Sequence, residues 1–160
     1  MKLRPIELSD IQQIRKWRNE QIENLRTPFY LTEVMQKSWF DNVVSDRNSK
    51  YRFYACEAKG LVGYCALEIS WENRQAELGI VLGQEHAGKQ YGYEIADLIL
   101  KEAFERLNLD HVTFETYGCN PYKSFWVKLI DKYKGKMVVI PNRKYAQGRY
   151  WDSIYGCISK

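Results

Sequence analysis

A glycine-containing loop that runs directly into a long amphipathic helix constrains the fold of this chain more than any other feature. The segment EHAGKQYGYEIADLILKEAFERL covers residues 85–107. Gly88 and Gly92 have no side chains, so main-chain N–H groups between them can approach a phosphate closely. The first helical turn adds unpaired donors and the positive end of the helix dipole. Apolar residues recur behind the loop at helical spacing and would pack the helix against a sheet: Ile95, Ala96, Ile99, Leu100, Ala103, Phe104 and Leu107.

The loop differs from the two best-known phosphate-binding motifs. A P-loop requires Ser or Thr after its Gly-Lys pair, whereas Gln90 follows Gly88-Lys89 here. A dinucleotide fingerprint requires three glycines in GxGxxG, and this loop has two. The segment ahead of the loop, residues 75–82, has the pattern of a strand that follows a turn at residues 72–74. The local order is therefore strand, glycine loop, helix.

Three further helices are expected. Ser9 and Gln12 form a capping-box pattern for the first, whose apolar face carries Ile11, Ile14 and Trp17. Thr32 is placed to cap the second, whose apolar stripe is Met35, Trp39 and Val43, with Phe40 and Val44 beside it. The last is expected to begin at Asn120, a favourable N-cap, with Pro121 at the first helical position.

Alternating segments rich in branched and aromatic residues predict the strands. They cover residues 52–57, 61–70, 75–82 and 111–117, and the first two form a hairpin around Ala58-Lys59-Gly60. Residues 137–140 and 150–158 are the last strands, joined by a long polar loop, PNRKYAQGR. The order is strand, two helices, three strands, helix, strand, helix, two strands. It predicts an α/β fold with a mixed, largely antiparallel central sheet flanked by helices.

Size and composition predict one domain over residues 1–160, in a cytoplasmic location, since no apolar run resembles a signal peptide or a membrane span. Four cysteines without CxxC spacing are expected to be buried free thiols. With only His86 and His111 and no His or Cys cluster, no metal site is expected. The net charge of +4 is interleaved with acidic residues, so no nucleic-acid partner and no membrane partner are expected.

The strand, loop and helix of residues 75–107 resemble those of the GNAT superfamily of acetyl-coenzyme A dependent N-acyltransferases. In that family a strand with an ELG-like segment leads into a Q/R-x-x-G-x-G/A loop that holds the coenzyme A pyrophosphate. Residues 87–92 keep the final glycine, with Ala87 where Gln or Arg is usual and Gln90 where the first glycine is usual. MKLRPIELSDIQQIRKWRNEQ, HVTFETYGCNPYKSFWVKL and GRYWDSIYGCI resemble further parts of the branch that includes ribosomal-protein N-terminal, polyamine and nucleotide-sugar acetyltransferases.

The resemblance implies splayed central strands, acetyl-CoA as co-substrate and a primary amine as acceptor. The pyrophosphate would bind to the loop residues Ala87, Gly88, Lys89, Gln90, Tyr91, Gly92 and Tyr93. The main chain of Ile80, Val81 and Leu82 would pair with the pantetheine arm, and one of these N–H groups would polarise the thioester carbonyl. Asn120 is either a further cofactor contact or only a helix cap.

Four side chains are candidates for the chemistry. Glu77 matches the recurrent strand-four glutamate of the family and is the candidate base, because an amine with a pKa of about 10.4 is mostly protonated at neutral pH. A solvated strand carboxylate is the alternative. Trp126 stands near the place of a tyrosine that serves as general acid in many members, but indole is no useful acid, so core packing is its alternative. Tyr122, Tyr133 or solvent would then protonate the thiolate.

Acceptor recognition is expected from the first helix, through Trp17, Arg18 and Asn19, and from two loops, one of which contains Tyr30. Core packing is the alternative for Trp17, and an exposed charge for Arg18. We expect a small metabolite amine, with an amino sugar on a nucleotide carrier ahead of a protein N-terminus or a polyamine, because no obvious acidic cluster suits a polycation. A catalytically silent acyl-CoA-binding module is the competing function. A homodimer is left open.

Overall fold

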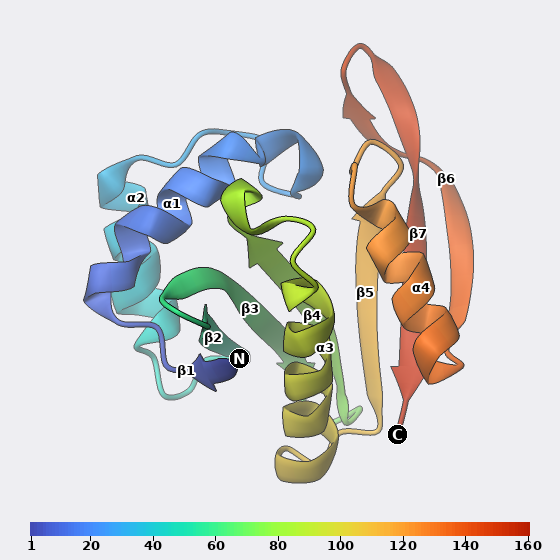
Figure 1. Ribbon diagram of the computed structural model, residues 1–160, viewed down its shortest axis with the longest axis horizontal. Coiled ribbons are helices and arrows are strands. Elements are labelled where there is room, and N and C mark those ends of the chain that lie inside the picture. The colour runs from blue at the N-terminus through green and yellow to red at the C-terminus, as the bar shows by residue number, and fades with distance from the viewer.

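A computed structural model describes all 160 residues and shows one twisted sheet flanked by helices (Figure 1). The strands lie in the order β1-β2-β3-β4-β5-β7-β6. Their bounds are β1 Lys2–Arg4, β2 Tyr51–Glu57, β3 Leu61–Ser70, β4 Gln75–Leu82, β5 His111–Tyr117, β6 Lys136–Ala146 and β7 Arg149–Ser159. The helices are α1 Ile11–Glu20, α2 Glu33–Trp39, α3 Tyr91–Lys101 and α4 Lys123–Tyr133. The predicted fold class and element order are confirmed.

Strands β4 and β5 are parallel neighbours in an otherwise antiparallel sheet. Their pairing begins at Gln75 with His111 and ends at Glu77 with Thr113. Because β4 continues to Leu82 and β5 to Tyr117, the strands separate beyond Glu77. Figure 1 shows them diverging toward the end of the sheet at which α1 ends and α4 begins. The predicted splay of the central strands is therefore present.

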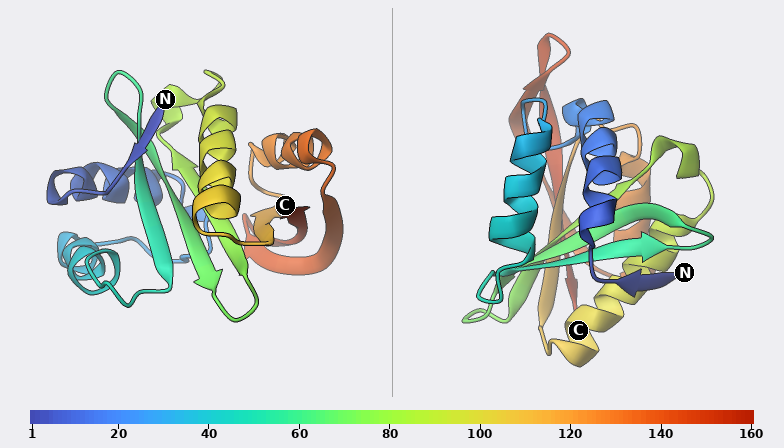
Figure 2. Two further views of the ribbon diagram at one scale, coloured as in Figure 1. Left: turned by 90° about the horizontal axis from the view of Figure 1, so that it is seen from below. Right: turned by 90° about the vertical axis from the view of Figure 1, so that its left-hand side faces the viewer.

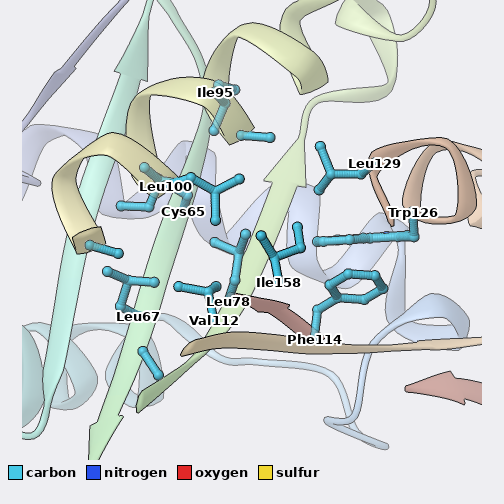
Figure 3. Packing of buried hydrophobic residues seen from close by; sticks show 14 of the residues in the cluster. Cys65, Leu67, Leu78, Ile95, Leu100, Val112, Phe114, Trp126, Leu129 and Ile158 are labelled. Carbon is cyan, nitrogen blue, oxygen red and sulfur yellow. The ribbon is translucent and has the colours of Figure 1, made fainter. Parts of the chain in front are cut away.

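Two hydrophobic clusters lie on opposite faces of the sheet, each covered by a pair of helices (Figure 2). The larger cluster packs α3 and α4 against the sheet, and Figure 3 shows its centre, where the Phe114 and Trp126 ring centroids are 4.5 Å apart. In the smaller cluster, α1 packs against the sheet through Ile14 and Trp17. Neighbouring positions of β4 alternate between them, because side chains along a strand point to opposite faces. No helix is long and apolar enough to cross a membrane.

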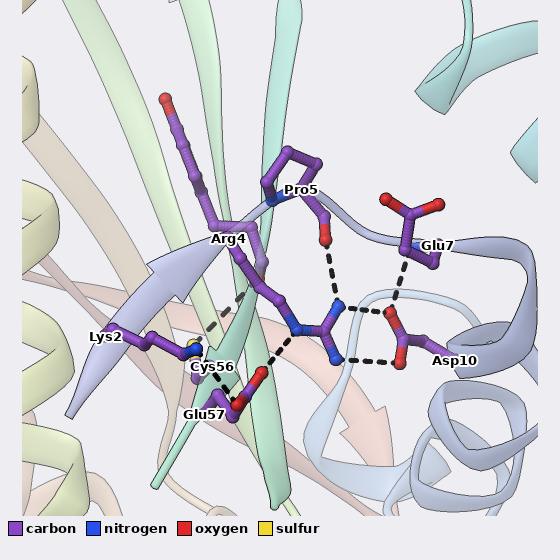
Figure 4. Close-up of polar contacts among 8 residues, drawn as sticks. Lys2, Arg4, Pro5, Glu7, Asp10, Cys56 and Glu57 are labelled. Atoms are coloured by element: carbon purple, nitrogen blue, oxygen red, sulfur yellow. Dashed lines mark hydrogen bonds and ion pairs between the residues drawn. The ribbon is translucent and has the colours of Figure 1, made fainter.

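An ion-pair network fastens β1 to the start of α1 (Figure 4). Arg4 donates from Nη1 and Nη2 to the two carboxylate oxygens of Asp10, at 2.7 and 3.0 Å, and from Nε to Glu57 Oε2 of β2 at 2.6 Å. The Arg4 hydrogen bond outweighs burial and holds the pKa of Asp10 below its ordinary value. The Glu7 N–H also donates to Asp10 Oδ2, at 2.8 Å. The capping carboxylate is therefore Asp10, and the prediction of a Ser9–Gln12 capping box is wrong.

The starts of the other helices agree only partly with prediction. Thr32 caps α2 as expected, and its hydroxyl accepts the Met35 N–H. The predicted position of Met35 in the buried stripe is wrong, since Met35 is exposed and Gln36 is buried. α4 begins at Lys123 rather than after Asn120, whose carboxamide oxygen instead accepts the Tyr122 N–H at 2.9 Å in the turn before the helix.

The predicted polar loop at residues 141–149 is wrong, because β6 and β7 continue to a two-residue turn. Gln147 and Gly148 form that turn with φ of 54° and 75°, the left-handed values of a tight hairpin. Pro141 is tolerated because β6 is an edge strand and its register shifts between Ile140 and Lys144. The residues looked like a loop in sequence because most of this end of the hairpin is exposed.

Candidate active site

A cavity of about 270 Å³ lies beside the open end of the sheet. It is bounded by the end of β4, by the loop before α3, by residues 120–126 and by residues 21–25, which follow α1. None of its 16 lining residues is charged. The predicted site residues that line it are Ile80, Leu82, Ala87, Gly88, Gln90, Gly92, Tyr93, Asn120 and Trp126. The structure thus brings together residues from the predicted loop, β4 and α4.

The loop before α3 has the backbone geometry of an anion-binding turn. Gly88 has a φ of 77°, and Gln90 has a φ of 62° and a ψ of 0° at the N-cap of α3. The N–H groups of Tyr93 and Glu94 donate to the Gln90 carbonyl, so those of the preceding helical residues have no helical acceptor and are available to a ligand. At Gly92, a Cβ atom would lie 3.2 Å from the Phe125 ring. This crowding accounts for glycine at that position.

The main chain of β4 presents alternate residues to the gap beside β5. The Gly83 N–H donates to the Val62 carbonyl of β3, at 3.1 Å. In an antiparallel ladder, bonded and non-bonded pairs alternate, so Val81 also directs its main-chain groups toward β3, while Leu82 and Ile80 direct theirs toward the gap. The prediction that Val81 pairs with the pantetheine arm is therefore wrong, and Ile80 and Leu82 remain candidates.

Gln21 is a cavity residue that the sequence did not reveal. Its side chain is 8% exposed, and its Nε2 donates to the Leu82 carbonyl oxygen at 2.7 Å. This bond ties the end of α1 to the end of β4. No motif marks Gln21, because its role depends on how α1 packs on the sheet.

None of the four residues predicted to bind the acceptor lines the cavity. Trp17 is 1% exposed and donates from Nε1 to Glu85 Oε1 at 3.0 Å, which fixes α1 to the turn before the glycine loop. Asn19 bonds the main-chain N–H and carbonyl of Leu31 at 2.8 and 3.0 Å. Arg18 donates to Thr27 Oγ1 at 2.8 Å. Arg18 and Asn19 therefore hold the segment between α1 and α2, whereas Tyr30 is exposed.

Glu77 belongs to a cluster of charges at the point where β4 and β5 separate. Arg26 Nη2 lies 2.6 Å from Glu77 Oε1 and 2.7 Å from Glu115 Oε2, and Arg143 Nε lies 3.1 Å from Glu115 Oε1. Burial raises the pKa of Glu115, but the hydrogen-bonded guanidinium groups of Arg143 and Arg26 outweigh it and hold that pKa below its ordinary value. Glu77 does not line the cavity. Arg26 and Glu115 have no sequence signal, because each is an isolated charge until the fold pairs them.

Of the candidate proton donors, only Tyr122 both carries a hydroxyl and lines the cavity. Trp126 is 7% exposed and packs on Phe114, as its core-packing alternative requires. Tyr133 lies outside the cavity lining and donates to Asp97 Oδ1 at 2.6 Å, so the structure does not support it as an acid. Burial and Asp97 raise the pKa of Tyr133. Tyr122 lines the cavity and is exposed.

The tip of the β6–β7 hairpin adds a cation to this side of the molecule. Lys144 donates from Nζ to the carbonyl of Leu25, a cavity residue, and lies 4.7 Å from the Tyr117 ring centroid. It forms no ion pair with a carboxylate, and burial lowers its pKa. Gln147 Nε2 donates to Glu23 Oε2 at 2.7 Å and fastens the hairpin to the same segment.

Comparisons with known proteins agree with this geometry. The model of the acetyltransferase (GNAT) domain matches residues 1–122. The uncharacterized N-acetyltransferase p20 of Bacillus licheniformis is 26% identical over 160 residues, covering 94% of this chain and 87% of that protein. The structure of spermidine N-acetyltransferase from Vibrio cholerae in complex with CoA and spermine has a TM-score of 0.85 at 21% identity, covering 99% of this chain and 94% of that one.

A mutant of the Vibrio cholerae enzyme has a TM-score of 0.84 at 22% identity, covering 99% of this chain and 95% of that one. At these identities the two structures show that the fold is shared. The family match covers more than half of the chain, from β1 through β5. The chain therefore belongs to the GNAT acetyltransferase family, whose members transfer an acetyl group from acetyl-CoA to an amine.

Proposed function

We propose that this N-acetyltransferase acts on a small primary amine that also carries a negative charge, with an amino sugar on a nucleotide carrier as the expected acceptor. The main support for this acceptor class is the distribution of charge. No carboxylate lines the cavity, and the partly buried Lys144 beside it has no carboxylate partner. A partly buried cation without a counter-ion favours an anionic ligand. The anion replaces part of the stabilisation by water that the cation loses on burial.

Arg18 supports the same acceptor class. Its guanidinium forms no ion pair, and its buried Nε has no hydrogen-bond partner. Arg18 on α1 and Lys144 on β6 are therefore two cations without a carboxylate partner. Both contact the segment that follows α1, at Thr27 and Leu25. A phosphate or carboxylate group on the acceptor could pair with either of them without displacing a carboxylate of the protein.

A polyamine is the first alternative, because the similar Vibrio cholerae structures are named for spermidine. Such an acceptor requires several carboxylates that converge on one pocket. The three nearest candidates from the sequence do not converge: Glu20 lies 3.9 Å from Lys16, Glu33 lies 3.2 Å from Arg15, and Glu23 accepts from Gln147. A protein N-terminus is the second alternative and would need an open groove.

The residues of the cavity fit acetyl-CoA as co-substrate. Residues 87–93 would hold the pyrophosphate, and the main chain of Ile80 and Leu82 would pair with the pantetheine arm. Bound acetyl-CoA supplies the acetyl thioester. Gln21 would keep Leu82 in position, and a main-chain N–H of β4 would polarise the thioester carbonyl. Tyr122 is the proposed proton donor, although a thiol with a pKa near 8.5 leaves readily as thiolate.

Glu77 is the proposed base for the acceptor amine. It lies three positions before the cavity residue Ile80 and pairs through Oε1 with Arg26. Glu77→Gln should lower turnover most at low pH, and a rise in pH should restore part of it, because neutral amine becomes plentiful without a base. The measurement is the pH dependence of kcat/KM. An unchanged rate and profile would assign Glu77 to the ion pair alone.

A panel of amines, followed by release of free coenzyme A thiol, tests the proposed acceptor. The panel contains nucleotide-linked amino sugars, free amino sugars, spermidine and a peptide with a free N-terminus. We expect the highest kcat/KM for the nucleotide-linked amino sugars. Turnover of spermidine or the peptide well above every amino sugar would contradict the acceptor class and leave the acetyltransferase activity intact.

A further inference from the structure

The Arg26 guanidinium lies at the point where β4 and β5 separate and contacts a carboxylate on each strand. Glu77 stands in the last parallel register of these strands, opposite Thr113, and Glu115 stands two residues farther along β5. The Arg26 guanidinium bridges the two carboxylates at 2.6 and 2.7 Å. Leu25, the residue before Arg26, lines the cavity. The segment that borders the cavity therefore neutralises both carboxylates beside it.

The two carboxylates differ in how far their charge is neutralised by Arg26 alone. Glu115 has a side chain 3% exposed and a second cation, Arg143, at 3.1 Å, so it stays paired if Arg26 is removed. Glu77 has Arg26 as its single ion-pair partner, and its side chain is 32% exposed. Removal of the Arg26 charge would therefore leave Glu77 as an unpaired carboxylate that solvent and ligands can reach.

The position of Arg26 is well supported by its neighbours. Arg18 bonds Thr27, the next residue, and Asn19 bonds the main chain of Leu31 at the far end of the same segment. Burial alone would lower the pKa of Arg26, but Glu77, Tyr117 and Glu115 outweigh it and raise that pKa. The guanidinium is therefore held between the carboxylates in its charged form.

We propose that Arg26 determines acceptor specificity by occupying the place that a second positive charge of a polycationic amine would take. One guanidinium nitrogen, Nη2, makes both contacts, so it fills the position between the two carboxylates that an ammonium would occupy. A free ammonium would have to displace a cation that is covalently tethered to the chain. An amine without a further positive charge meets no such competition. This role rests on the proposed function, in which the acceptor binds at the side of the cavity that residues 21–25 line. Arg26 would then disfavour polyamines by direct competition for the two carboxylates.

Calorimetric binding of spermidine to the protein saturated with coenzyme A tests the proposal. Arg26→Gln removes the charge and keeps a polar side chain, so we expect spermidine to bind about tenfold more tightly or better than to the parent. Propylamine, which has a single charge, should gain less. Arg26→Lys keeps a cation beside Glu77 and should bind spermidine as weakly as the parent does.

Arg143→Gln is the matched control, because it removes the other cation of Glu115 and leaves the Arg26–Glu77 pair intact. It should leave spermidine affinity within about twofold. Coenzyme A affinity and thermal midpoint, measured on every variant, confirm that each one is folded. The double variant Arg26→Gln with Glu77→Gln should lose the gain, since it removes the carboxylate that Arg26→Gln exposes.

Two results would overturn the proposal: no gain in spermidine affinity in folded Arg26→Gln, or an equal gain in Arg143→Gln. Neither result depends on turnover, so the test is separate from that of the proposed function. The latter fails if the parent acetylates spermidine in preference to amino sugars. A gain in Arg26→Gln together with such turnover would overturn the acceptor class and would show that Arg26 weakens spermidine binding without excluding polyamines.

Discussion

Gln90 holds a left-handed backbone conformation at the start of α3, with a φ of 62° and a ψ of 0°. A residue with a Cβ atom costs about 1–2 kcal/mol there, which glycine avoids, although glycine loses more backbone entropy on folding. Gln90→Gly should therefore raise the free energy of unfolding by up to about 1 kcal/mol, measured by urea denaturation. Gly88→Ala, at a φ of 77°, should lower it. A loss of stability in Gln90→Gly would show that the glutamine side chain makes a contact worth more than the strain.

Gly92 lies where the loop passes the aromatic side of α4. Since a Cβ atom would lie 3.2 Å from the Phe125 ring, the branched side chain of Gly92→Val should shift Phe125 or the loop and fill the anion site. We expect this variant to lose the thermal shift that acetyl-CoA produces, and Gly92→Ala to lose part of it. A folded Gly92→Val protein that binds acetyl-CoA as tightly as the parent would contradict the assignment of the loop.

At the scale of elements, β1 and α1 are joined by charge rather than by apolar packing alone. Arg4 pairs with Asp10 ahead of α1 and with Glu57 on β2. Asp10 has a side chain 8% exposed, and its pKa is lowered in the folded protein. A carboxylate with a lowered folded pKa stabilises the fold above its unfolded pKa of about 3.9, and that contribution is lost as pH falls through the folded value.

Asp10→Asn should therefore destabilise the protein at pH 7, by about 2 kcal/mol, and this difference should shrink as pH falls below about 4. The measurement is the urea midpoint of parent and variant between neutral and acidic pH. Lys37→Gln is a useful control, because it breaks an ion pair with Asp41 in which both side chains are exposed and which lies outside the Arg4 network. A difference that stays constant down to acidic pH would mean that Asp10 acts through its hydrogen bonds and not its charge.

At the scale of the whole molecule, the two halves of the sheet meet through a parallel pairing that ends at Glu77 and Thr113. The cavity beside their open end is lined from both halves, by β4 and by residues 120–126. A ligand bound there should hold the halves together. Acetyl-CoA at a hundredfold excess over its Kd should add about 2.7 kcal/mol of stability, a rise in Tm of roughly 5–10 °C. Gly92→Val serves as the control, and an unchanged Tm in the parent would place the coenzyme elsewhere.

Local patterns determined the strands and the glycine loop before α3. Residues 61–70, 75–82 and 111–117 form the strands that alternation and turn residues predicted, because a period of two and its interruptions are local properties. The loop before α3 could be located for the same reason, since glycine spacing and the following apolar periodicity both lie within a short segment. Polar residues occur both in loops and in exposed strands. The sequence therefore predicted a loop for the polar part of β6, which is a strand.

Only the tertiary structure decided which residues meet beside the open end of the sheet. Gln21 reaches Leu82, and Arg26 reaches Glu77 and Glu115, across long separations in the chain. Likewise the direction of the Val81 main chain depends on the register of β4 against β3. An isolated Arg or Gln in a loop has no periodicity, so nothing local specifies its partner. Its partner is set when α1 packs on the sheet and carries the following segment across the gap between β4 and β5.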